Sequence, residues 1–147
     1  MKKFFTRYLL IALLPVMAAF SLPSHADSMT PKHKVVIQVS SGSKKTQTIA
    51  MNNAVNLQKA LGMDNVKIEI VAYGPGLQMM TAKSKDAKRV SSLVQQGIRF
   101  SACHNTMLKI QKKTGHLPKL ANGVKVVPGG VVRIMELQEQ GYSYIRP

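Results

Sequence analysis

Two hydrophobic patterns alternate along this chain. Short runs rich in Val and Ile predict β-strands, and apolar residues spaced three or four positions apart predict amphipathic helices. Strands are expected over residues 34–39, 66–71, 98–102, 124–127 and 142–145. Helices are expected over 46–61, from a Ser84 cap to Gly97, over 107–113, and after Pro128-Gly129-Gly130. The predicted order is therefore a regular alternation of five strands and four helices.

This alternation is typical of a parallel sheet with helices on both faces. Because crossover connections are right-handed, an open doubly wound sheet is the simplest solution. With five strands, we predict an α/β, flavodoxin-like three-layer sandwich with a mostly parallel sheet. The loops at 40–43, 73–76, 103–106 and 128–130 should then meet at the carboxyl edge of the sheet, where ligands bind in such folds.

The N-terminal segment has the three regions of a secretory signal peptide. Basic residues open it, an apolar run follows over 9–20, and Ser24-His25-Ala26 supplies small residues for cleavage after Ala26. The apolar run is shorter than the roughly 20 residues that span a bilayer. We therefore expect a signal peptide over 1–26, no stable membrane insertion after its removal, and a periplasmic protein.

The mature chain should form a single domain. A flexible polar lead is expected over 27–33, followed by one domain over 34–147. Cleavage removes Lys2, Lys3 and Arg7, so the formal net charge falls from +15 to +12. The lysines are scattered and are not interleaved with aromatic residues, which favours a solvated basic surface over a nucleic-acid site. Such a surface suits anionic ligands, including oxyanions of sulfur; a polyanion binder is a further alternative.

The single cysteine excludes an internal disulfide framework and any multi-cysteine zinc site. Cys103 is expected where a strand ends and a helix begins, and free N–H groups and the helix dipole lower a thiol pKa there. A thiolate attacks sulfur and can carry it as a persulfide. The other interpretation is a buried cysteine that packs as a small hydrophobic residue, and the pattern leaves both open.

Other candidate chemistry is sparse. His104 follows the cysteine directly, and adjacent helical residues do not face each other, so a Cys–His pair is not expected there. Tyr73-Gly74-Pro75-Gly76 either offers N–H donors to an anion or forms a tight turn that requires glycine. The six acidic residues form no pair suited to acid/base hydrolysis. No metal site and no organic cofactor are expected.

Three segments, taken in their order along the chain, resemble the DsrE/DsrF-like sulfur-relay family. They are the Tyr73-Gly74-Pro75-Gly76 turn, the motif at 102–106, and the C-terminal stretch over 126–147. The resemblance runs from about Lys34 to the C-terminus and would make this a secreted, single-domain form. It implies a flavodoxin-like sandwich, a homotrimer or homohexamer, and a match between Cys103 and the family's sulfur-accepting cysteine.

The resulting hypothesis is a periplasmic sulfur-handling protein with Cys103 as nucleophile and carrier, as a sulfurtransferase or as a carrier without catalysis. Its partner would be a small sulfur compound or a sulfur-carrier protein. The expected supporting residues are those whose backbone N–H groups face the sulfur, His104, Asn105 and Thr106, and those that shape the pocket, Gly74, Pro75 and Gly76. The alternative is a non-catalytic oligomeric binding module with a structural cysteine.

Overall fold

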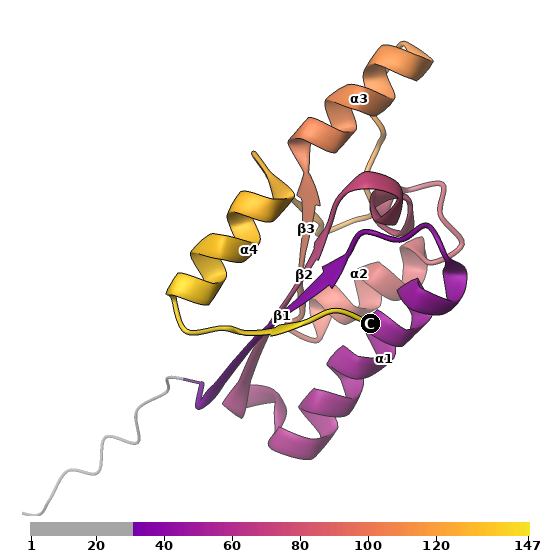
Figure 1. Cartoon of the computed structure of the whole chain (residues 1–147). Coiled ribbons are helices and arrows are strands. Elements are labelled where there is room, and N and C mark those ends of the chain that lie inside the picture. Colours follow the sequence, from indigo (N-terminus) through magenta and orange to yellow (C-terminus); the bar gives the residue numbers. More distant parts are fainter. Residues whose placement is uncertain (1–30) are drawn as a thin grey trace, which may run out of the picture.

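The computed structural model describes residues 31–147 and shows a five-stranded sheet with helices on both sides (Figure 1). The strands are β1 (His33–Val39), β2 (Val66–Ala72), β3 (Arg99–Cys103), β4 (Lys125–Val127) and β5 (Ser143–Ile145). The α-helices are α1 (Lys44–Leu61), α2 (Ala87–Gln95), α3 (His104–Thr114) and α4 (Gly130–Glu139). Two 3₁₀ segments are η1 (Met63–Asn65) and η2 (Gly74–Met80). The predicted signal peptide lies outside the described residues.

The sheet is entirely parallel, with strand order β4-β3-β2-β1-β5. The predicted flavodoxin-like α/β sandwich is therefore confirmed. The chain steps outward from β1 to β4, and α4 then returns it to β5, which pairs with the free side of β1. The five strands predicted a flavodoxin-like strand order, in which the second strand occupies that side of β1; the order in the structure differs, because β5 takes that place.

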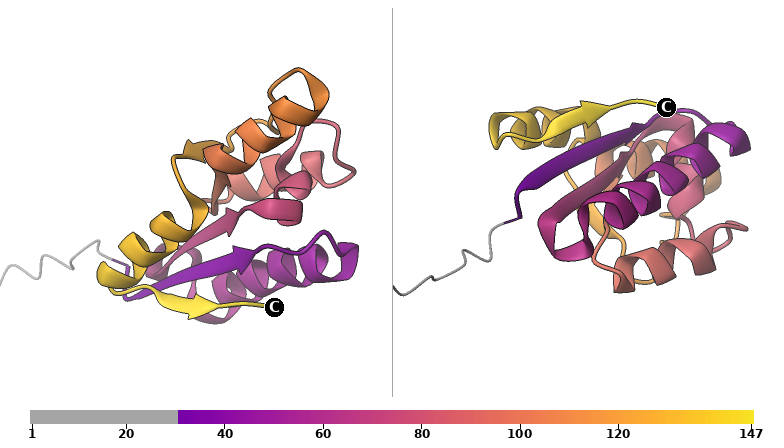
Figure 2. Two further views of the ribbon diagram at one scale, coloured as in Figure 1. Left: turned by 45° about the horizontal axis from the view of Figure 1, so that its top comes forward. Right: turned by 90° about the horizontal axis from the view of Figure 1, so that it is seen from below.

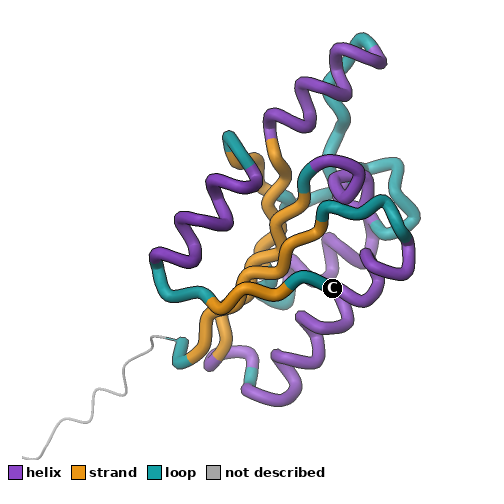
Figure 3. Tube along the Cα trace, in the orientation of Figure 1, coloured by secondary structure: helices purple, strands orange, loops and turns teal. Residues whose placement is uncertain are grey.

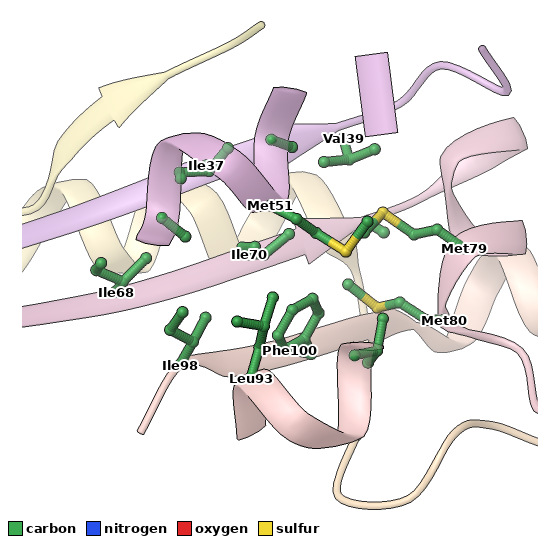
Figure 4. Close-up of a cluster of buried hydrophobic side chains, with 14 of the residues drawn as sticks. Ile37, Val39, Met51, Ile68, Ile70, Met79, Met80, Leu93, Ile98 and Phe100 are labelled. Atoms are coloured by element: carbon green, nitrogen blue, oxygen red, sulfur yellow. The ribbon is translucent and has the colours of Figure 1, made fainter. Parts of the chain in front are cut away.

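The larger core lies on the face covered by α1, α2 and η2. Side chains alternate between the two faces of a strand, so Val35, Ile37 and Val39 of β1 all point into this core. Figure 4 shows Ile37 and Val39 in this core, with Met51 of α1 and residues from the neighbouring strands. The segment η2 was not predicted, but it contributes Leu77, Met79 and Met80, which are fully buried.

A smaller cluster lies on the opposite face, beneath α4. Figure 2 shows α4 on the side of the sheet away from α1 and α2. Val36 and Val71 of the sheet pack there against Ile134 and Leu137 of α4. Helix α3 does not cover this face. It projects beyond the end of β3 (Figure 3), and the one buried residue of the helix is Met107.

The start of α3 corrects the sequence prediction. The helix was expected from Met107, but it begins at His104, with Cys103 itself as the N-cap in extended conformation. No loop separates β3 from α3, so the helix leaves the sheet edge in the direction in which the strand was running. Similarly, α2 begins at Ala87 and its N-cap is Asp86 rather than Ser84.

A buried ion pair joins α4 to the middle of the sheet. Glu69 of β2 is only 2% exposed and accepts two hydrogen bonds from the guanidinium of Arg133, each 2.8 Å long. The Ser101 hydroxyl on β3 donates a third bond of 2.6 Å to the same carboxylate, and Arg99 approaches it to 3.5 Å. This bidentate pair holds the first turns of α4 against β2 and β3.

The carboxylate is charged in the folded protein. Burial acts to raise the pKa of Glu69, but the hydrogen bonds from Arg133 and Ser101 and the charge of Arg99 outweigh it, so that the net pKa is lowered. A carboxyl group with a lowered folded-state pKa stabilises the fold above its unfolded pKa, and this contribution is lost as pH falls through the folded-state pKa.

We predict that Glu69→Gln lowers the free energy of unfolding by about 2–3 kcal/mol at pH 7, because it leaves Arg133 without its buried partner. The difference from the wild type should shrink as pH falls below about 4.3, the ordinary pKa of Glu. Urea unfolding at several pH values measures this. Glu136→Gln is the matched control: this exposed acid also pairs with Arg133, and its loss should cost less than about 1 kcal/mol.

Candidate functional site

Cys103 lies at the carboxyl edge of the sheet, as the last residue of β3 and the N-cap of α3. It is paired across the sheet with Val127, and only 5% of its surface is exposed. The thiol is free, and it lines a cavity of about 240 Å³. It is therefore buried, yet it borders a space that a small donor can enter.

Several polar groups converge on the sulfur from the first turns of α3 and α4. Burial acts to raise the pKa of Cys103, but the Thr106 hydroxyl and the backbone N–H groups of Thr106, Gly130 and Asn105 outweigh it. The net pKa of the thiol is lowered, which favours the thiolate. The thiol makes no helix-cap hydrogen bond of standard geometry, so these groups act as nearby dipoles that interact most strongly with the ionised sulfur.

Thr106 connects the thiol to the preceding loop of the sheet. Its Oγ1 accepts a 3.0 Å hydrogen bond from the backbone N–H of Gly74. Because that bond occupies an acceptor site of the hydroxyl, the hydroxyl hydrogen can be directed to Cys103. The Asn105 N–H is less favourably placed, since it also donates a long 3.4 Å bond to the Pro128 carbonyl.

The hydrogen bonds of the turn at 73–76 favour the interpretation as a tight turn that requires glycine. The Gly74 N–H donates to Thr106 and the Gly76 N–H donates to the Tyr73 carbonyl, so both are used within the protein rather than offered to an anion. Gly76 is required because a Cβ there would overlap the carbonyl oxygen of Val39 on β1. The turn thus brings Gly74 to Thr106 by passing close to β1.

Gly130 was not singled out by the sequence analysis as a site residue, although it lies in one of the loops expected at this edge. It begins α4 at the end of β4, and β4 is the neighbour of β3, so its N–H lies beside Cys103. A Cβ at Gly130 would lie 2.9 Å from Cδ1 of Tyr73, whereas one at Gly129 would meet nothing closer than 3.4 Å. Glycine at 130 therefore lets α4 approach both the Tyr73 ring and the thiol.

The structure brings together only some of the residues expected at the site. Asn105 and Thr106 line the thiol cavity with Cys103, but His104 is not among the lining residues. Gly74 and Pro75 line the adjoining groove, and Gly76 is buried beneath the turn. The cavity also involves Tyr73, Gly129 and Gly130 from the loops expected at this edge, and three residues that sequence reasoning missed, Lys109, Val131 and Val132. What these residues share in the sequence is that each of them follows the end of β2, β3 or β4.

Within residues 31–147, no three His, Cys, Asp or Glu side chains are grouped so that they could hold a metal ion. No helix in the same residues has the length and apolar character needed to cross a membrane.

An all-parallel α/β domain with a lone thiol at its carboxyl edge defines the class of protein, and comparison with known proteins identifies the family. Residues 33–147 match the DsrE/DsrF-like family, and the chain belongs to it. This family is associated with sulfur relay. None of the curated proteins matches the sequence significantly.

The solved structures that resemble this one include the following two. A protein of unknown function from Methanobacterium thermoautotrophicum, MTH1491, is 34% identical, with a TM-score of 0.71 over 78% of this chain and 99% of that one. The ychN protein from E. coli is 14% identical, with a TM-score of 0.62 over 80% of this chain and 100% of that one. The second likeness concerns the fold alone.

We predict that Thr106→Val raises the pKa of Cys103, because it removes a hydroxyl that stabilises the thiolate. The pH dependence of alkylation by iodoacetamide measures that pKa. Thr106→Ser keeps the hydroxyl and should retain the wild-type profile. An unchanged profile in Thr106→Val would show that the hydroxyl does not act on the sulfur.

Proposed function

We propose that this protein accepts sulfur on Cys103 and transfers it onward as a persulfide. The main support is the position of the one thiol, which lines a cavity at the carboxyl edge and has a lowered pKa. The association of the family with sulfur relay points to the same chemistry. The cavity around the thiol is small, about 240 Å³, which suits a terminal sulfur atom better than a bulky electrophile.

The reaction needs only a thiolate and a donor with a sulfur–sulfur bond. The Cys103 thiolate attacks the outer sulfur of the donor, a new sulfur–sulfur bond forms at Cys103, and the donor's own sulfur–sulfur bond breaks. The bonding electron pair leaves with the remainder of the donor, as sulfite when the donor is thiosulfate. The N–H groups of Thr106 and Gly130 stabilise the negative charge on the carrier sulfur before and after the step.

Secretion to the periplasm is part of this proposal and rests on the signal-like segment over 1–26. The periplasm is an oxidising compartment in which an exposed thiol forms disulfides. Cys103 is 5% exposed, and its cavity admits a small molecule more readily than a second protein chain. Burial therefore protects the carrier from pairing with another copy while it leaves access to small donors.

Assembly into a homotrimer or homohexamer is the second part of the proposal. Exposed apolar side chains gather on β4 and on the outer side of α4: Val126, Val131, Val132 and Met135 are each at least half exposed. An apolar patch of this kind on a small domain typically marks a protein contact. Because Val131 and Val132 also line the thiol cavity, a subunit seated there would border the site.

Intact-mass measurement tests the carrier function. After exposure to thiosulfate or polysulfide, the wild type should gain the mass of one sulfur atom, and a reducing thiol should remove it. Cys103→Ser should gain none, and it should fold, because serine is a favoured N-cap residue. Equal uptake by the variant, or none by the wild type, would contradict the proposal. A wild-type thiol that is also alkylated only slowly near neutral pH would favour the binding module with a structural cysteine.

A charge in the apolar patch should disrupt assembly. We predict that Met135→Glu converts the oligomer to a monomer in size-exclusion chromatography with light scattering, because a buried unpaired charge opposes association. Leu117→Glu is the control, since this exposed residue lies away from α4 and β4. A wild type that is monomeric at micromolar concentration would contradict the oligomer.

A further inference from the structure

A second, larger cavity adjoins the thiol cavity. It is a groove of about 630 Å³ between η2 and α3. Tyr73, Thr106 and Lys109 line both spaces, so the groove lies directly beside the cavity that holds Cys103. Its volume falls in the range of small-molecule sites, roughly 300–1,000 Å³. In Figure 1, α3 projects away from the sheet. The groove lies on the side of α3 that is lined together with η2.

The walls of the groove are apolar on one part and positively charged on another. Pro75, Ile110 and Pro118 supply apolar surface, and Lys109 and Lys113 stand one helical turn apart on α3. No acidic residue lines the groove. Within residues 31–147, neither lysine forms an ion pair, so their charges are available to an anionic ligand.

The distance between the thiol and the outer lysine sets the length of the ligand. Along α3, Lys113 lies about 15 Å from Cys103, at about 1.5 Å per residue. Helical side chains lean toward the N-terminus, so the ammonium of Lys113 reaches back toward the thiol. A ligand with its sulfur at Cys103 and an anionic group at Lys113 must therefore extend on the order of 10 Å. An inorganic donor is too short to use the groove, whereas an organic molecule the size of a small peptide fills it.

We propose that the groove binds the organic part of a low-molecular-weight persulfide that carries a carboxylate, and that it presents the outer sulfur to Cys103. This inference rests on the proposed carrier function and names its donor class. The Cys103 thiolate attacks the outer sulfur of R–S–SH, and the bond between the two donor sulfurs breaks. Cys103 becomes the persulfide, R–S⁻ leaves and takes a proton from water, and no external oxidant is consumed.

Sulfur transfer from two donors tests the groove. Glutathione persulfide is the organic probe, with two carboxylates on a tripeptide, and inorganic polysulfide is the short one. In the full chain, Lys113→Glu should slow uptake from glutathione persulfide about fivefold to tenfold, because it replaces attraction by repulsion at an exposed site. Uptake from polysulfide should change less than twofold. The effect should weaken at high salt, where exposed charges are screened.

The helix offers a matched control. Lys112→Glu makes the same change of charge on the same exposed part of α3, but Lys112 does not line the groove, so both rates should stay at the wild-type level. Gln78→Trp tests the volume rather than the charge: this exposed residue of η2 lines the groove, and a larger side chain there should slow the organic donor alone.

Binding of S-methylglutathione separates this inference from the carrier proposal, because that molecule has no sulfur to transfer. Calorimetry should show binding to the wild type and to Cys103→Ser, and fivefold to tenfold weaker binding to Lys113→Glu. If no donor transfers sulfur but this binding pattern holds, two claims are overturned: that Cys103 carries sulfur, and that the ligand of the groove is a sulfur donor. The groove then remains a binding site for an anionic organic molecule. If sulfur is transferred and neither rate nor binding responds to Lys113→Glu or Gln78→Trp, the groove proposal is overturned and the carrier stands.

Discussion

The site depends on one junction, where β3 runs into α3 without a loop and Cys103 belongs to both. As the last strand residue, the cysteine is held by pairing with Val127 and is almost completely buried. As the N-cap of α3, it also faces helix N–H groups that have no partner within the helix. Burial alone would keep the thiol neutral, and the helix start alone would leave it in open solvent. The junction combines a protected sulfur with a stabilised negative charge.

The groups that lower the pKa of Cys103, together with the residue that supports one of them, lie in the segments that follow β2, β3 and β4. Thr106 comes from the same helix, Gly74 supports Thr106 from the turn after β2, and Gly130 approaches from the start of α4 after β4. The buried pair of Glu69 and Arg133 keeps α4 against the sheet and so maintains the approach of Gly130. The fold therefore controls the chemistry of the thiol through contacts that lie well outside its own cavity.

The direction of α3 has a second consequence. Because the helix continues beyond the sheet, one of its sides stays uncovered and forms a wall of the groove beside η2. Two lysines of that wall bear charges that no described acidic residue compensates. The same junction that lowers the pKa of the thiol thus also leaves the groove open beside it.

The alternation of strands and helices can be predicted from the amino-acid sequence, and with it a parallel sheet whose carboxyl edge carries the lone cysteine. These features are local or periodic: Val and Ile runs, helical spacing and glycine stops predict them without any knowledge of distant contacts. The same reasoning placed Asn105 and Thr106 near the thiol, because they follow it in the chain.

Four features could be learned from the folded structure alone: the strand order, the burial of Cys103, the hydrogen bond from the Gly74 N–H to Thr106, and the position of Gly130 beside the sulfur. The structure also shows that α3 begins at His104 and not at the predicted Met107, so that Cys103 is the N-cap of the helix. Each of these depends on a contact between residues far apart in the chain, such as Gly130 with Tyr73 or Glu69 with Arg133. Local periodicity carries no information about such contacts, because they arise only when the elements pack.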